Sequence, residues 1–209
     1  MPELDDYFDR LDTERVSRIR ELTAIRRSFS ISIDTSQATV HSKATVVLCY
    51  AAWEGFYNEC VTEYCAFLTA KGGKVKRTDW LMLLGVIGSD LDSLRARNHS
   101  SKARFKFVND LKRRLESEFD QFDANYVKAR SNLDFDRLSL NYNILSFNLT
   151  PFQRHRIRLD KELVGWRNSV AHGEEPDLSG LDIVKHVDFT SELLIVLADA
   201  FQEGMLKRI

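Results

Sequence analysis

The sequence predicts an all-α protein, a bundle of about six or seven helices in a single domain that spans residues 1–209. Glycine and proline are scarce, with 9 and 3 among 209 residues, whereas an all-β domain needs a turn signal about every 8–12 residues. Apolar residues recur at steps of three and four along most of the chain, which is the helical period. No two segments show the alternation expected of a strand pair. At 44% hydrophobic residues, the chain can bury a sizeable core.

The first two helices are predicted from contrasting patterns. Residues 4–29 have one apolar side and are expected to form an amphipathic helix. Residues 36–69 are apolar on most sides, which is typical of a helix at the centre of a core. Lys71, Gly72 and Gly73 are expected to end that helix, because glycine readily adopts the left-handed conformation that follows a helix. The residues expected to cap its start are Asp34, Thr35 and Ser36.

The rest of the chain supplies the other helices. They are predicted over residues 80–94, 102–119, 133–145, 152–172 and 181–206. Thr78 and Asp79 are expected to cap the first of these. Residues 120–132 are predicted to be a polar connection, and Gly173 is expected to end the helix over residues 152–172.

Composition and charge exclude several classes of protein. The 30 Lys and Arg against 31 Asp and Glu give a formal net charge of −1, which argues against a generally basic nucleic-acid coat. The 3 cysteines lack CxxC spacing, so we expect buried free thiols in a reducing compartment rather than disulfides or a zinc ribbon. The acidic start of the chain lacks the apolar region of a targeting signal, and charged side chains interrupt the longest apolar-rich stretch, residues 44–68. We therefore expect a soluble cytoplasmic protein with no membrane segment, metal or cofactor.

The neutral sum hides a strongly basic segment. Residues 95–114 carry eight basic side chains and one acid, Asp110. Phe105 and Phe107 lie among them, and basic side chains interleaved with aromatics can follow a phosphate backbone and stack on bases. The alternative is a solvated helix face whose aromatic side chains point into the core.

The most informative stretch for chemistry is the helix predicted over residues 152–172. On one continuous α-helix, side chains three and four apart share a side, and one such line along this helix is made up wholly of polar or small residues. The line consists of Arg154, Arg158, Lys161, Gly165, Asn168 and His172. A phosphodiester strand along it would meet cations first and a titratable group at the end. We therefore expect Arg154, Arg158 and Lys161 to bind the phosphates of a nucleic acid.

Arg167 falls between the two apolar rows of the same helix, where an unpartnered cation is costly. Asp160, two turns earlier, and Glu54, in the central helix, are the candidate partners. One interpretation is a buried ion pair without chemistry. The other is a cation that these carboxylates hold in place and aim at a phosphate.

His172 is predicted to lie in the last turn of its helix. The negative end of the helix dipole, with Glu174 and Glu175 nearby, favours its charged form, whereas neighbouring arginines oppose it. Such a histidine can give or take a proton in catalysis. The alternative is a histidine that only caps the helix. The other four histidines show no comparable setting and no metal-ligand spacing.

The run Arg167-Asn168-Ser169-Val170-Ala171-His172 resembles the R-x4-6-H signature of the HEPN superfamily, including the polar residue after the arginine. Three further segments resemble the stand-alone bacterial subgroup related to the MAE-like and RiboL-PSP types. They are the opening helix, the run Tyr-Ala-Ala-Trp-Glu-Gly-Phe over residues 50–56 and the Ser-Asn-Leu of residues 131–133. The resemblance implies a helical bundle that dimerises. Many members of the superfamily are metal-independent endoribonucleases of toxin–antitoxin, abortive-infection or CRISPR-linked antiviral defence, so the resemblance implies this activity as well.

For this chain, the resemblance implies that Arg167, Asn168 and His172 are catalytic and meet the same residues of a second protomer. Arg167 and His172 are about 140° apart around one helix. One copy therefore does not readily bring both to one atom, whereas two copies across a two-fold axis can. We predict a homodimer that binds RNA in the shared cleft, where His172 deprotonates a ribose 2′-OH and a 2′,3′-cyclic phosphate forms. A cognate antitoxin protein is a further candidate partner.

Two other interpretations stay open. Some HEPN proteins are non-catalytic RNA- or nucleotide-binding modules, antitoxins or scaffolds, because a fold does not fix a function. The second of these interpretations is a purely structural helical protein whose Arg167 forms an ion pair. The sequence identifies neither the RNA target nor an antitoxin.

Overall fold

Helices make up most of the chain that the computed structural model describes, which is residues 3–29, 35–119, 122–130, 132–178 and 180–209, with the backbone alone for residues 35–38. The longer helices are α1 (Leu4–Phe29), α2 (Thr35–Lys71), α3 (Leu83–Ala96), α4 (Ser101–Glu116), α5 (Phe135–Leu145) and α9 (Ile183–Leu206). Within these described ranges, the one β-type pairing is an isolated bridge between Lys74 and Glu118. The predicted all-α fold is confirmed.

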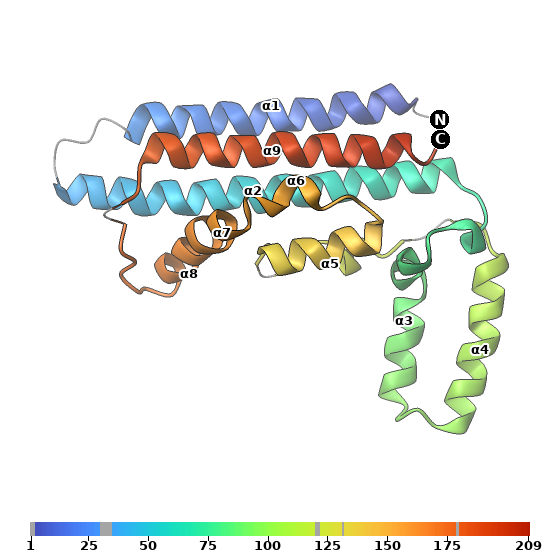
Figure 1. Cartoon of the computed structure of the whole chain (residues 1–209). Helices are drawn as coiled ribbons and strands as arrows, with labels where there is room; N and C mark the ends of the chain where they lie inside the picture. Colours follow the sequence, from blue (N-terminus) through green and yellow to red (C-terminus); the bar gives the residue numbers. More distant parts are fainter. Residues whose placement is uncertain (1–2, 30–34, 120–121, 131, 179) are drawn as a thin grey trace.

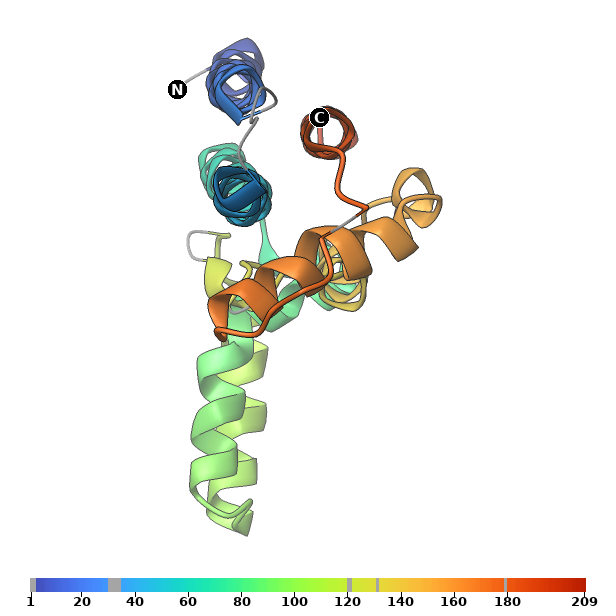
Figure 2. The same cartoon turned by 90° about the vertical axis from the view of Figure 1, so that its left-hand side faces the viewer.

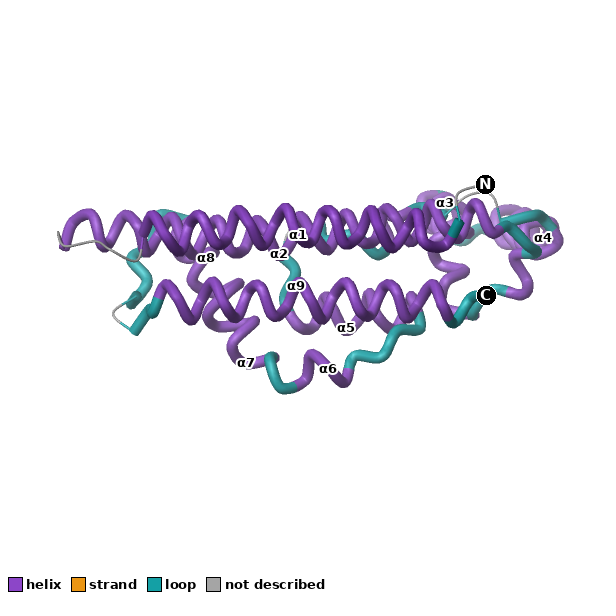
Figure 3. The backbone as a smooth tube through the Cα atoms, turned by 90° about the horizontal axis from the view of Figure 1, so that it is seen from above, coloured by secondary structure: helices purple, strands orange, loops and turns teal. Residues whose placement is uncertain are grey.

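The body of the protein consists of α1, α2 and α9, which run side by side with α1 antiparallel to the other two (Figures 1 and 3). As predicted, α2 is the central helix, because it contacts α1, α9 and the short helix α8 (Trp166–Ala171). Its largest buried side chains are Tyr50, Trp53, Phe56, Tyr57 and Tyr64. One part of α2 departs from the prediction of an all-round apolar core helix. Near its start, Val40, Val47 and Leu48 are 63%, 37% and 41% exposed.

The helix predicted over residues 152–172 is not continuous. It is divided into α6 (Thr150–Gln153), α7 (Arg156–Arg158), a π-helix (Leu159–Gly165) and α8 (Trp166–Ala171). At the end of the π-helix, the Trp166 N–H donates to the Lys161 carbonyl five residues earlier, one residue more than in an α-helix. A Cβ on Gly165 would lie 3.0 Å from the Asp160 carbonyl oxygen. Gly165 therefore fits this wider turn, because a side chain at this position would crowd the Asp160 carbonyl.

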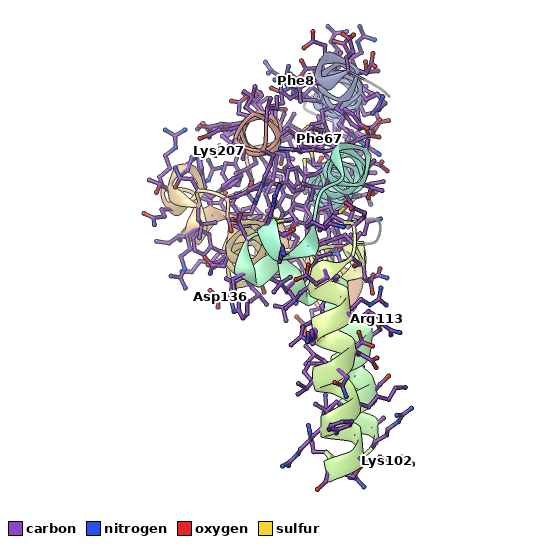
Figure 4. The ribbon with its side chains drawn as sticks, turned by 90° about the vertical axis from the view of Figure 1, so that its right-hand side faces the viewer. Phe8, Phe67, Lys102, Arg113, Asp136 and Lys207 are labelled. Carbon is purple, nitrogen blue, oxygen red and sulfur yellow. The ribbon has the colours of Figure 1, made fainter. Side chains whose placement is uncertain are left out.

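The hairpin of α3 and α4, which we call the arm, projects from the body at the end where both termini lie (Figures 1 and 4). Its first helix is preceded by a 3-10 turn, Trp80–Met82. Asp79 makes no side-chain cap there and instead forms an ion pair with Arg208, so its predicted capping role is wrong. On α3, Gly85 and Gly88 leave room for the rings of two residues from the connection before α5, Phe122 and Tyr126.

Two further sequence predictions have clear outcomes. Gly72, Gly73 and Gly173 have φ angles of 66°, 105° and 73°, so glycines end their helices as expected. Cys49 and Cys60 are buried free thiols, whereas Cys65 is only half-buried. None of the helices within the described ranges has the length and apolar character that crossing a membrane requires. The predicted caps Asp34, Thr35 and Ser36 lie outside the side chains that the structure describes.

Gly204 provides a test of the core packing. A Cβ at Gly204 would lie 2.3 Å from a ring carbon of Phe147. That ring cannot easily move, because it packs edge-on against three aromatic neighbours, Tyr64, Tyr142 and Phe201. We expect Gly204→Ala to lower the free energy of unfolding by about 1–3 kcal/mol in urea denaturation. The control is Gly180→Ala, where a Cβ meets nothing within 4 Å. Equal losses in the two variants would contradict this packing.

Candidate functional site

The candidate site lies where α8 packs beneath the first half of α2 (Figures 1 and 2). Arg167 is half-buried there. Its Nη1 donates hydrogen bonds to the Oδ1 atoms of Asn132, at 3.0 Å, and Asn168, at 2.8 Å. Its guanidinium carbon lies 4.3 Å from the centre of the Tyr50 ring, which is a cation–π contact. Arg167 is therefore held by two amide oxygens and an aromatic ring.

These neutral partners leave the charge of Arg167 uncompensated. Among the residues that the structure describes, no carboxylate forms an ion pair with Arg167, and its Nε and Nη2 have no acceptor. The interpretation of Arg167 as one half of a buried ion pair therefore has no support in the described structure. A half-buried guanidinium with two unused donor atoms can instead bind a phosphate oxygen.

Two buried side chains of α2 position Asn132. The Tyr50 hydroxyl accepts a hydrogen bond from the Leu133 N–H at 3.0 Å, and the Trp53 indole N–H donates to the Leu133 carbonyl at 2.9 Å. This clamp fixes the backbone just before α5, where the Asp134 carboxylate caps the helix. The run 50–56, which carries part of the family resemblance, therefore positions the acceptor that holds Arg167.

The two carboxylates predicted to support Arg167 have other contacts. The Oδ1 of Asp160 accepts from the Phe135 N–H at 2.8 Å, which ties the π-helix to the start of α5. Glu54 acts on Tyr50. Burial raises the pKa of Tyr50 to about 12. The hydrogen bond from the Leu133 N–H lowers this pKa, whereas the charge of Glu54 raises it further. Tyr50 therefore stays a neutral phenol beneath Arg167.

His172 is the C-cap of α8 and is exposed. The Gly173 N–H donates to the Val170 carbonyl at 3.2 Å, and the Glu174 N–H donates to the Ser169 carbonyl at 2.9 Å. Together these bonds form a Schellman motif, which ends the helix and turns the chain away. The His172 ring has no partner among the described residues, so it is accessible to a ligand.

The predicted line of cations does not lead to His172, because the π-helix changes the angle between successive side chains. Arg154 forms an ion pair with Glu192 of α9 at 2.7 Å, and Arg158 lies 4.0 Å above the ring of Phe189, also of α9. Lys161 is exposed on the π-helix. The structure therefore places Arg154 and Arg158 beside α9, away from the contacts of Arg167.

Sequence reasoning missed a cavity of about 470 Å³ between the π-helix and α9. Its lining includes Arg158, Trp166, His186 and Phe189. Burial lowers the pKa of His186 to about 4, so this histidine is neutral. Throughout the described part of the chain, this cavity included, no three His, Cys, Asp or Glu side chains are grouped as metal ligands would be.

Comparison with known proteins identifies a family. The family model RiboL-PSP-HEPN matches residues 13–203. That span includes α2, the loop that holds Asn132, and the Arg167 to His172 run. No curated protein and no solved structure matches the chain.

The clamp on Leu133 predicts a difference between two tyrosine variants. Tyr50→Phe keeps the ring beneath Arg167 but leaves the Leu133 N–H without its acceptor. We expect this to lower the free energy of unfolding by about 1–3 kcal/mol. The Tyr142 hydroxyl is buried with no partner among the described residues, so Tyr142→Phe should leave stability unchanged or raise it. Urea denaturation measures both variants, and a neutral Tyr50→Phe would show that the clamp contributes little.

Proposed function

The chain belongs to the RiboL-PSP-HEPN family, and on that premise we propose that it is a metal-independent endoribonuclease. The observation that carries the proposal is the setting of Arg167, a half-buried cation whose described partners are all neutral. His172, an exposed imidazole, lies at the end of the same short helix. An uncompensated cation and an accessible proton carrier are what phosphodiester cleavage by a ribose hydroxyl requires.

In the proposed reaction, neutral His172 takes the proton of a ribose 2′-OH, and the 2′-oxygen attacks the adjacent phosphorus. The bond from phosphorus to the 5′-oxygen breaks, and that oxygen takes a proton from the charged His172 of a second copy. The Nε and Nη2 of Arg167 stabilise the charge that builds on the non-bridging oxygens. The products are a 2′,3′-cyclic phosphate and a 5′-hydroxyl. DNA lacks the attacking hydroxyl and is not cleaved.

Asn168 has two roles in this proposal. Its Oδ1 accepts from Arg167 at 2.8 Å, which fixes the orientation of the amide. Its amide nitrogen has no acceptor within the described ranges. We assign that nitrogen to the phosphate, beside the free donors of Arg167.

A second copy is proposed because Arg167 and His172 of one copy face different surroundings. Arg167 points to α2 and the Asn132 loop, whereas His172 lies in solvent beyond the end of α8. A two-fold axis near His172 would bring the histidine of one copy towards the arginine of the other.

An apolar patch beside His172 supports such an axis. Val40, Val47 and Leu48 share one side of α2 and are exposed. Lys43, on the same stretch of α2, pairs with Glu175 of the loop after His172 at 3.3 Å, which places the patch near the end of α8. Figure 2 views α2 end-on between α1, α8 and α9, with one side uncovered by other described helices. We propose that a second copy covers this patch.

The test is cleavage of labelled single-stranded RNA with and without EDTA. We expect equal cleavage in both conditions and 2′,3′-cyclic phosphate ends. We expect Arg167→Ala and His172→Ala each to slow cleavage by roughly 10²–10⁴-fold. Asn168→Ala should slow it as well, whereas its control Asn143→Ala, an exposed asparagine on α5, should not.

Full activity of His172→Ala, or a strict need for a divalent metal, would overturn the assignment. RNA binding without cleavage in either condition would instead favour a non-catalytic binding module.

A further inference from the structure

The arm carries positive charge that the protein does not neutralise. Among the eight basic side chains of residues 95–114, Arg113 pairs with Asp110 at 3.0 Å and Arg114 lies 3.8 Å from Asp90. The other basic side chains are exposed and have no ion-pair partner among the described residues. They are Arg95, Arg97, Lys102, Arg104, Lys106 and Lys112. Asp110 and Glu116, the acids of α4, both lie in ion pairs already. This surface therefore has the charge of a polyanion-binding site.

Two large apolar side chains lie exposed among these cations. Phe105 is 72% exposed and Val108 is 62% exposed. Ala103 is buried and Phe107 is half-buried, so the arm is held together by the other side of α4. The alternative that the aromatic side chains of this segment point into a core therefore fails for Phe105. Phe105 and Val108 are three residues apart on α4 and therefore form one exposed apolar patch among the cations.

The position of the arm makes this surface reachable by a long ligand. The arm stands clear of the three-helix body, with Lys102 at its far tip and Arg113 nearer the body (Figure 4). It lies at the opposite end of α2 from α8, and both project from the same side of α2 (Figure 1). A strand bound to the arm therefore occupies a surface separate from Arg167 and His172.

We propose that the arm is a second RNA-binding element, which holds single-stranded RNA outside the candidate cleavage site. The cations of α4 contact successive phosphates, and the Phe105 ring stacks on an unpaired base. Single-stranded RNA fits better than a duplex, because the faces of paired bases are not accessible to a side chain. RNA as the ligand rests on the proposed function, whereas the affinity of the arm for it does not require cleavage.

The test measures binding to a labelled single strand of 2′-O-methyl RNA, which has no free 2′-hydroxyl and cannot be cleaved by the proposed reaction. Lys102→Gln with Lys106→Gln should weaken binding by about tenfold at physiological salt. A plot of the logarithm of the association constant against the logarithm of the salt concentration has a negative slope. The steepness of that slope should decrease by about 1.4, which is about 0.7 for each of the two lost phosphate contacts. The matched control is Arg20→Gln with Arg27→Gln, which removes two exposed cations of α1 that have no ion-pair partner in the described chain.

Phe105 separates stacking from charge. Phe105→Ala should weaken binding of the single strand by roughly tenfold with an unchanged salt slope, because stacking carries no charge. It should leave binding of a duplex of the same sequence unchanged. Phe105→Trp should restore the affinity and report base stacking as quenched fluorescence.

The two proposals fail separately. Weaker binding by the arm variants, in a protein that does not cleave RNA, would support the arm and count against the nuclease. Arm variants with unchanged affinity and salt slope, or the same loss in the α1 control, would overturn the role of the arm. Arm variants that keep their affinity for RNA but no longer bind an acidic protein partner would also overturn the role of the arm.

Discussion

Two buried polar atoms of α2 determine where Arg167 lies. Tyr50 and Trp53 are buried in the core, and each has one polar group that needs a hydrogen-bond partner. Both groups find it on the backbone of Leu133. The same packing that stabilises α2 therefore fixes Asn132 beside Arg167 and places a neutral ring beneath it. A carboxylate in either position would have cancelled the charge that a phosphate needs.

The π-helix before α8 decides which side chains reach that position. Its wider turns rotate the residues before it relative to those after it. Arg154 and Arg158 consequently contact α9, whereas Arg167 contacts α2 and the loop before α5. Asp160, within the π-helix, holds the start of α5 in register with this arrangement. Short π segments inside helices are rare and occur frequently at functional sites.

Apolar periodicity was enough to predict the six longer helices, and glycine chemistry was enough to predict where α8 ends. Apolar periodicity could not predict the π-helix, because a hydrogen bond to the carbonyl five residues earlier does not change the order of apolar and polar residues in the sequence. The expected partnership of Asp160 with Arg167 assumed α-helical spacing, whereas Asp160 in the π-helix accepts a hydrogen bond from the Phe135 N–H. Asn132 was part of the family resemblance, but a side chain in a connecting loop has no periodicity that would place it beside Arg167. Phe105 and Phe107 carry the same apolar signal, and only the structure separates the exposed ring from the half-buried one.

The proposed reaction depends on two copies of His172 that share one cleft, and thiol cross-linking measures this directly. The native thiols Cys49 and Cys60 are buried and Cys65 is half-buried, so they interfere little. His172→Cys, treated with a short bis-maleimide at a concentration where the wild type cleaves RNA, should form a covalent dimer. Added RNA should block the cross-link, and Thr13→Cys, exposed on α1, should give none. A His172→Cys protein that stays monomeric, or equal cross-linking at Thr13→Cys, would contradict a site shared between two copies.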